Sequence, residues 1–120
     1  MPAEPHEIEL HDPEDVKIVS LARSTRARTS AAEGACVRDT DGRTYAAATV
    51  DLDSLRLSAV QVAVAMAVSS GASGLEAAVV LGEATTAAHA DLAAVRDLAG
   101  AGAGFFVAAP DGSVVESTTT

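Results

Sequence analysis

The stretch LSAVQVAVAMAVSSGASGL, residues 57–75, decides how the rest of the chain is interpreted. It contains no charged residue, and up to Val68 it is apolar on nearly every side, interrupted only by Ser58 and Gln61. In a water-exposed domain, a helix that is apolar all round is buried all round. We therefore expect residues 57–70 to form a central helix with other elements packed on several of its faces, and Val60 and Val64 to be buried.

A membrane-spanning helix is the competing interpretation, because a span needs about 20 apolar residues. The stretch is rich in Ala rather than in Leu, Ile and Phe, and the Ser-Ser-Gly and Ser-Gly steps at residues 69–71 and 73–74 end the helical pattern early. These features favour a buried helix. Residues 1–15 are acidic and lack the basic region and apolar run of a signal peptide. We expect a soluble cytoplasmic protein.

The composition indicates one small domain with an acidic surface. The chain has 120 residues, of which 48% are hydrophobic but only 2% aromatic, so the core must consist of small Ala, Val and Leu side chains. The net charge of −9 disfavours binding to nucleic acid and to anionic membranes. The excess of Ala, Asp, Val and Arg over Lys is typical of high-GC bacterial proteins. The single cysteine, Cys36, excludes an intrachain disulfide and is interpreted as a small core residue.

Hydrophobic periodicity and turn signals predict a three-layer α/β/α domain with a mixed sheet, covering residues 13–120, after a flexible arm at residues 1–12. The histidines of the arm, His6 and His11, are interpreted as solvated. Asp12 caps the first helix, and Arg23, Arg26 and Arg28 near its end favour the negative end of the dipole over an anion site. The further elements are strands at 34–37 and 43–50 around a turn at 39–42, the central helix capped by Asp53 or Ser54, a strand at 76–82, a helix at 85–99, a strand at 105–109, and a short strand at 113–116 before a frayed end.

Several short segments are informative as an ordered series. They are Gly-Ala-Cys-Val at 34–37 with Asp-Gly at 41–42, Thr-Val-Asp at 49–51, Ser-Ala-Val-Gln at 58–61 running on to Ala-Val-Ser-Ser-Gly at 67–71, and residues 107–120 with their Pro-Asp-Gly and Thr-Thr-Thr. This series resembles the cytidine deaminase family, with its Val-Gly-Ala-Ala strand, Asn-Val-Glu segment and Cys/His-Ala-Glu-Arg helix. The resemblance covers residues 13–120 and implies a cytidine deaminase-like fold.

The resemblance also implies an active site that this sequence does not match. These deaminases use a zinc-bound water to attack the base and a Glu to shuttle protons. A hydroxyl, a methyl and one carboxylate cannot replace three Cys or His zinc ligands, so we expect no zinc and no other cofactor. The matching positions, which would form a vestigial pocket, are Asp51 for the ribose-binding Glu, Ser58 for the first zinc ligand, Val60 for the proton-shuttling Glu, Gln61 for the Arg, and Ala88 and Asp91 for the Pro-Cys-x-x-Cys pair.

Three functions remain open from the sequence. The first is a catalytically inactive, deaminase-like protein that acts as an interaction or scaffold protein. The second is a nucleoside or nucleotide sensor that uses the vestigial pocket, although Tyr45 is the only aromatic residue near its strands. The third is an active deaminase or hydrolase with displaced metal ligands, His89 and Asp91 with His11, although side chains two residues apart on a helix point in different directions.

The expected partners follow from the central helix. An Ala-rich core buries little apolar area per residue, so we expect a homo-oligomer, a dimer or a tetramer, that buries the outer side of residues 57–70. The resembled deaminases associate around the same helix. An unknown protein partner is the further expectation for a scaffold protein, with neither nucleic acid nor membrane as a partner.

Overall fold

The structure, a computed structural model, describes residues 7–120, so His6 and half of the predicted arm lie outside it. A five-stranded mixed sheet has the order β2-β1-β5-β6-β7, in which β5 and β6 are parallel and the other neighbours antiparallel. The elements are α1 (Pro13–Thr29), β1 (Gly34–Asp39), β2 (Thr44–Ala48), β3 (Val50–Asp51), β4 (Arg56–Leu57), α2 (Ala59–Ser69), β5 (Leu75–Leu81), α3 (His89–Ala99), β6 (Gly104–Ala108) and β7 (Val114–Thr119).

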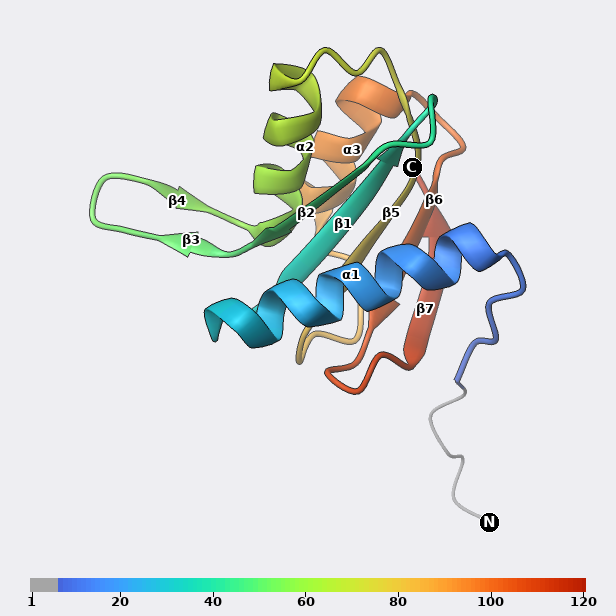
Figure 1. Cartoon of the computed structure of the whole chain (residues 1–120), viewed down its shortest axis with the longest axis horizontal. Coiled ribbons are helices and arrows are strands. Elements are labelled where there is room, and N and C mark those ends of the chain that lie inside the picture. The colour runs from blue at the N-terminus through green and yellow to red at the C-terminus, as the bar shows by residue number, and fades with distance from the viewer. Residues whose placement is uncertain (1–6) are drawn as a thin grey trace.

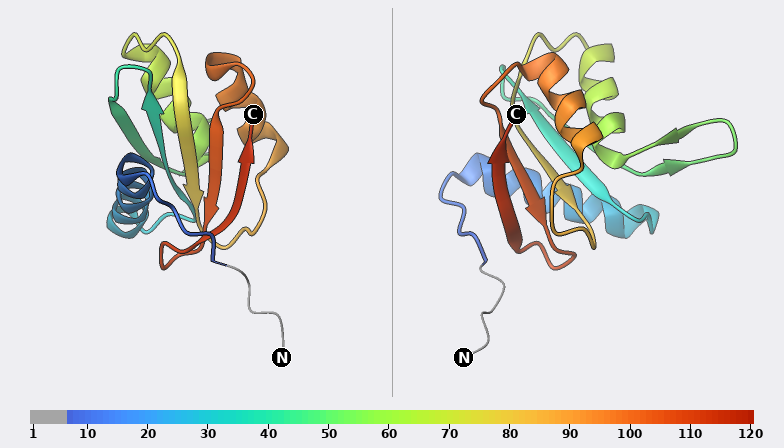
Figure 2. Two further views of the ribbon diagram at one scale, coloured as in Figure 1. Left: turned by 90° about the vertical axis from the view of Figure 1, so that its right-hand side faces the viewer. Right: turned by 180° about the vertical axis from the view of Figure 1, so that it is seen from behind.

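Helices cover both faces of this sheet (Figures 1 and 2). Helix α1 lies across one face, and α2 and α3 lie on the other. The strand residues alternate between the two cores: Ala35 and Val37 contact the α2 face, whereas Cys36 between them contacts the α1 face. The predicted three-layer α/β/α architecture is confirmed. Among the described residues, no helix is long and apolar enough to cross a membrane.

The α1 layer packs unusually close to the sheet. Asp12 caps the helix as predicted, accepting a hydrogen bond from the Glu14 N–H at 2.9 Å. A Cβ placed on Gly34 would lie 2.1 Å from the carbonyl oxygen of Ala22, so only glycine permits this approach. Cys36 is fully buried beneath α1, and burial raises the pKa of its thiol to about 11. It is a core residue, as expected.

The turn between β1 and β2 is organised by a buried carboxylate, Asp39. It accepts hydrogen bonds from the N–H groups of Asp41 and Arg43, both at 2.9 Å, from the Arg43 Nε at 3.0 Å, and from the Tyr45 hydroxyl at 2.8 Å. Burial alone would raise the pKa of Asp39, but these donors outweigh it and lower the pKa below its ordinary value. The Asp-Gly turn is where the sequence predicts it, and Gly42 supplies the positive φ of 83°.

Helix α2 begins later than predicted. Its N-cap is Ser58, not Asp53 or Ser54, because residues 50–57 form a separate hairpin in which Val50 pairs with Leu57. Ser58 and Gln61 make a reciprocal capping box, which fixes the first turn of α2. The hairpin projects from the body of the domain (Figure 1), and this second small sheet was not predicted.

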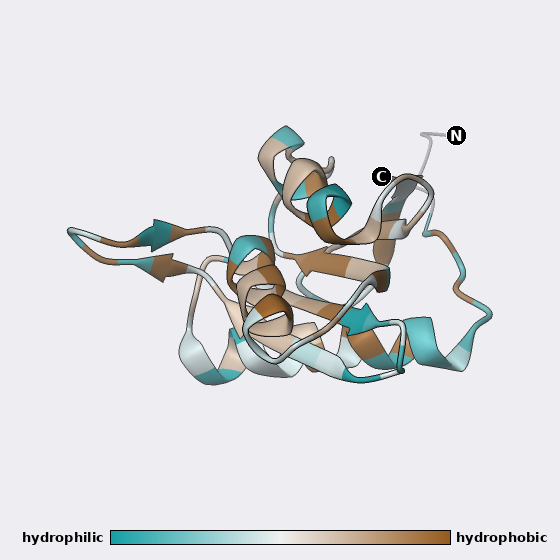
Figure 3. Ribbon diagram, turned by 90° about the horizontal axis from the view of Figure 1, so that it is seen from above, coloured by the Kyte–Doolittle hydropathy of each residue, from teal (hydrophilic) through white to brown (hydrophobic). Residues whose placement is uncertain are grey.

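The expectation that α2 is buried all round is wrong for a single chain. The sheet and α3 cover only part of its circumference, so Val60 is fully buried, Val64 only partly, and Met66 and Val68 are 39% and 55% exposed. Figure 3 shows apolar residues around α2 and along the projecting hairpin. The apolar outer side of α2 is therefore accessible in the monomer.

Several further boundaries differ from the prediction, most of all that of α3. Helix α3 starts at His89 rather than at residue 85, because Ala88 is extended and the Ala87 N–H donates to the Glu116 carboxylate at 3.0 Å. Strand β7 reaches Thr119, since Thr118 and Thr119 pair with Phe105 and Gly104 instead of fraying. Strand β1 continues to Asp39, which brings this residue into the turn described above.

Candidate functional site

Most of the sequence-predicted positions converge at one end of the sheet, where the N-termini of α2 and α3 lie on the same face. Ser58, the N-cap of α2, donates its hydroxyl to the Asp91 carboxylate in the first turn of α3, at an Oγ–Oδ1 distance of 2.6 Å. The same Ser58 oxygen accepts the Gln61 N–H at 3.1 Å. Two of the three positions expected for zinc ligands therefore touch each other directly.

Asp91 is a buried carboxylate with few partners. It is 3% exposed, and the Ser58 hydroxyl is the one hydrogen-bond donor to its side chain among the described residues. Burial raises the pKa of Asp91 above its ordinary value, and the Ser58 hydrogen bond offsets only part of this rise. The site thus holds a carboxylate whose charge is poorly compensated.

The other predicted positions are distributed differently. Val60 is fully buried in the core beneath the first turn of α2, and Gln61 closes the capping box through its side chain. Ala88 is the exposed N-cap of α3, one turn before Asp91. Asp51 lies on the projecting hairpin, where its side chain is 79% exposed and forms an ion pair with Arg56 at 3.4 Å. We find that the structure joins Ser58, Gln61 and Asp91 but leaves Asp51 on the exposed hairpin.

Sequence reasoning missed Glu33, a partly buried carboxylate immediately before β1. Burial, and secondly the negative charge of Asp91, raise the pKa of Glu33. Thr49 fixes its main chain, because the Glu33 N–H donates to the Thr49 Oγ1 at 3.0 Å and the Thr49 N–H donates to the Glu33 carbonyl at 3.1 Å. A Cβ on Gly82 would lie 3.1 Å from the Glu33 Cγ, so this glycine makes room for the side chain. The sequence signal that could have identified Glu33 is its position as a charged residue directly before a buried strand.

The residues at this site do not fit zinc. Ser58 offers a neutral hydroxyl already engaged by Asp91, Ala88 offers a methyl group, and Asp91 offers one carboxylate, whereas zinc sites use three or four Cys, His or carboxylate ligands. Within residues 7–120 there is no group of three His, Cys, Asp or Glu side chains that could hold a metal ion. His11 and His89 are exposed, and the structure does not bring them together with Asp91 in such a group.

The sequence of this chain matches one known protein family over most of its length. The sequence family described as cytidine deaminase-like matches residues 11–112. The chain belongs to the cytidine deaminase-like family. This family membership agrees with the resemblance given by the ordered segments of the sequence, and it covers the whole region from the end of the arm to the β6–β7 turn.

Two solved structures have the same fold as this cytidine deaminase-like chain. Cytidine deaminase from Burkholderia pseudomallei is 19% identical, with a TM-score of 0.75 over 86% of this chain and 90% of that one. Cytidine deaminase from Mycobacterium leprae is 17% identical, with a TM-score of 0.71 over 90% of this chain and 94% of that one. No curated protein sequence matches significantly. At these identities, the structural similarity establishes the fold.

Proposed function

We propose that this cytidine deaminase-like protein does not deaminate and acts by binding other proteins, including further copies of itself. The observation that carries the proposal is the 2.6 Å hydrogen bond between Ser58 and Asp91, where metal ligands are expected. The Ser58 hydroxyl and the Asp91 carboxylate thus bind each other in the place where the metal ion of a deaminase would lie. A zinc ion in the same place would have to displace it and would gain only one strong ligand.

The proton-transfer chemistry is missing as well. Val60 occupies the position of the proton-shuttling Glu, and its isopropyl group is fully buried in the core. Glu33 and Asp91 are acidic groups at the same end of the sheet, but carboxylates alone do not generate the hydroxide that attacks the base. Apolar packing in place of the proton-shuttling group favours a role in protein binding over catalysis.

The outer side of α2 supports self-association. Met66 and Val68 on α2, and Leu52 and Leu55 on the projecting hairpin, are four of the five large hydrophobic residues exposed within residues 7–120. Exposed apolar residues of this kind mark interaction surfaces. Met66 and Val68 lie two residues apart and therefore on different flanks of the exposed side of α2, which a closed dimer would cover with its own copy. Ala63 and Ala67 face the core, so they do not contribute to this surface.

Zinc content and activity test the loss of deamination. We expect the purified protein to contain no stoichiometric zinc and to convert no cytidine to uridine. A variant carrying Ser58→Cys, Val60→Glu, Ala88→Cys and Asp91→Cys is the positive control, and we expect it to bind zinc before it regains activity. One zinc atom per parent chain, or uridine formation by the parent, would contradict the proposal.

Light scattering tests the self-association. We expect the parent to exceed the monomer mass of 12.0 kDa at micromolar concentration, and Val68→Glu to shift it towards the monomer, because a charge on the apolar side of α2 opposes contact. Asp97→Asn, on the exposed surface of α3, is the control that leaves the mass unchanged. A monomeric parent would contradict this part of the proposal.

A further inference from the structure

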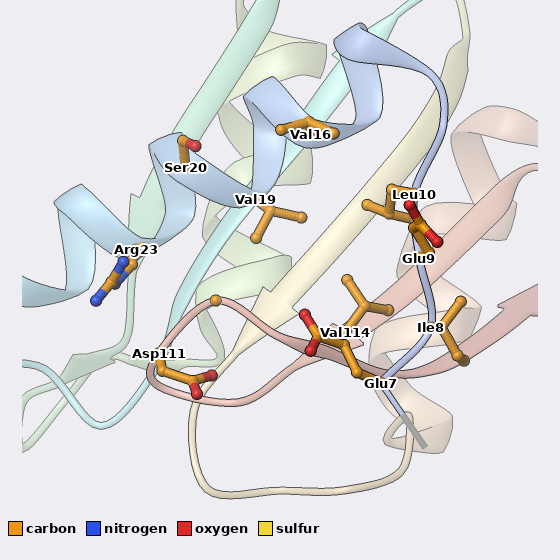
Figure 4. Close-up of a pocket in the computed structure, with 11 residues that line it drawn as sticks. Glu7, Ile8, Glu9, Leu10, Val16, Val19, Ser20, Arg23, Asp111 and Val114 are labelled. Atoms are coloured by element: carbon orange, nitrogen blue, oxygen red, sulfur yellow. The ribbon is translucent and has the colours of Figure 1, made fainter. Parts of the chain in front are cut away.

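A groove of about 320 Å³ lies on the α1 side of the sheet, opposite the face that holds Ser58 and Asp91. Its walls are helix α1, residues 7–10 of the N-terminal segment, and the β6–β7 turn (Figure 4). Figure 4 shows Val19 of α1 and Val114 of β7 directed towards the same space, with Leu10 beside them. Val16, which is 46% exposed, extends this apolar floor to the rim. Nothing in the proposed function uses this groove.

The rim of the groove is acidic. Glu7, Glu9 and Asp111 line it, and the only cation among the lining residues is Arg23. The stem of Arg23 packs over Gly112, where a Cβ would lie 3.6 Å from the Arg23 Cδ, and Figure 4 shows its guanidinium directed away from the groove. Asp111 already accepts hydrogen bonds from the Ser113 N–H and hydroxyl, and the charge of Arg23 also helps to lower its pKa, so Glu7 and Glu9 are the carboxylates that the groove offers to a ligand, in a chain of net charge −9. This pattern complements a ligand that is both cationic and apolar.

The main chain beside the groove favours an extended ligand. The Ile8 N–H donates to the Val114 carbonyl at 2.7 Å in a single antiparallel bridge. β7 is the edge strand of the sheet, and within residues 7–120 this bridge is its one pairing on the outer side. Ile8 already occupies the edge at Val114, so an extended peptide can lie in the groove alongside residues 7–10 and place its aliphatic side chains on the apolar floor.

We propose that the groove binds a short extended segment of a partner protein in which aliphatic residues alternate with Lys or Arg. The aliphatic side chain fills the space between Val19 and Val114, and the basic side chains reach the carboxylates of Glu7 and Glu9. A groove of about 320 Å³ accommodates about one to three side chains. This inference rests on the proposed role in protein binding but uses the opposite face of the sheet.

A peptide titration followed by nuclear magnetic resonance tests it. The probe is the blocked peptide acetyl-Lys-Val-Lys-Val-Lys-amide, added to the full chain at 50 mM salt. We expect amide shifts clustered at Ile8, Val19, Gly112 and Val114. A peptide with Glu in place of Lys should bind at least about tenfold more weakly, because it lacks the positive charges that complement the acidic rim. A peptide with Ser in place of Val should be weakened as much, because it lacks the aliphatic side chains that fill the floor.

Two pairs of variants test whether the peptide binds at the groove, each pair consisting of a change in the groove and a control outside it. Val16→Ser removes apolar surface from the rim, and Ala93→Ser is its control on α3, where an exposed apolar side chain lies outside the groove. Glu7→Gln with Glu9→Gln removes two charges, and Asp97→Asn is the control on α3. We expect each groove variant to weaken binding about threefold to tenfold, with unchanged circular dichroism, and both controls to bind as the parent does.

Several outcomes would overturn the inference. The first is equal binding of the Lys-Val and Lys-Ser peptides, which would indicate attraction by charge alone. The second is a set of amide shifts on α2 or α3 instead of at the groove. The third is a control variant that weakens binding as much as the groove variants do. The failure of this inference and the failure of the proposed function are distinguishable, since zinc or deaminase activity in the parent would contradict the loss of catalysis but leave peptide binding at this groove unchanged.

Discussion

Two buried aspartates of this domain have opposite environments. Asp39 receives hydrogen bonds from two main-chain N–H groups, a guanidinium and a phenol, and its pKa is lowered. Asp91 receives one hydrogen bond from Ser58, and its pKa is raised. A fully hydrogen-bonded carboxylate stabilises the turn that surrounds it, whereas a poorly hydrogen-bonded one costs stability when ionised. The difference distinguishes a carboxylate that stabilises a turn from one at the candidate functional site.

The two environments give opposite dependences of stability on pH. Because the folded-state pKa of Asp39 is lowered, its contribution to stability is present above the unfolded pKa and is lost as the pH falls through the folded pKa. Because the folded-state pKa values of Asp91 and Glu33 are raised, their contribution is present below the unfolded pKa and is lost as the pH rises through the folded pKa. Substitutions at the two aspartates can therefore test the comparison directly.

The largest effect is expected for Asp39→Asn. The amide keeps one acceptor but directs an NH₂ group towards donors of Arg43 or Tyr45, and it loses the attraction of the Arg43 guanidinium. We expect the midpoint of thermal unfolding at pH 7 to fall by on the order of 10 °C. The gap to the parent should narrow at acidic pH, where the parent carboxylate is protonated. A constant gap across pH would show that the turn depends on shape rather than charge.

An intermediate effect is expected for Ser58→Ala. This change removes the N-cap of α2 and the hydrogen bond to Asp91 together, so we expect the free energy of unfolding at pH 7 to fall by about 1–3 kcal/mol in chemical denaturation. Ser58→Thr keeps the hydroxyl and is the matched control. A loss below about 0.5 kcal/mol in Ser58→Ala would mean that water satisfies both groups and that the site is open.

The smallest effect, and the one of opposite sign, is expected for Asp91→Asn. The amide oxygen still accepts from Ser58 while the uncompensated charge is removed, so the free energy of unfolding at pH 7 should stay within about 0.5 kcal/mol of the parent or exceed it. The parent should gain stability relative to this variant as the pH falls towards 4, near the ordinary pKa of 3.8. Destabilisation at pH 7 comparable to that of Asp39→Asn would remove the distinction between the two sites.

Most of the fold could be predicted because its signals are local. The Asp12 cap, the Asp-Gly turn before Arg43 and the apolar run of residues 76–82 each specify an element through neighbouring residues. The hairpin at residues 50–57 was missed, although apolar and polar residues alternate along each of its arms, because each arm is short and its tip, Asp53-Ser54, is typical of a helix cap. The N-cap was misplaced for the same reason, since Asp53 and Ser54 look like caps until the hairpin is recognised.

The candidate site was only partly predictable. The family resemblance identified Ser58 and Asp91 as positions, but their direct contact depends on how α2 and α3 pack, which no local pattern contains. Glu33 was missed because its partial burial arises from Thr49 and Gly82, two residues on other segments. Asp51 was expected in the pocket and instead lies exposed on the hairpin, because the two-residue strands carry it away from the domain.

The Asp39 turn also has a consequence for the order of folding. Its Tyr45 contact joins residues 6 positions apart, whereas the Ser58–Asp91 contact joins residues 33 positions apart. Closing a short loop costs less conformational entropy than closing a long one, so the β1–β2 hairpin can form early and offer β1 as a template for β5. Changes at the turn are then expected to slow folding, and changes at Ser58–Asp91 to speed unfolding. The carboxylate that stabilises the native turn thereby also guides the assembly of the sheet.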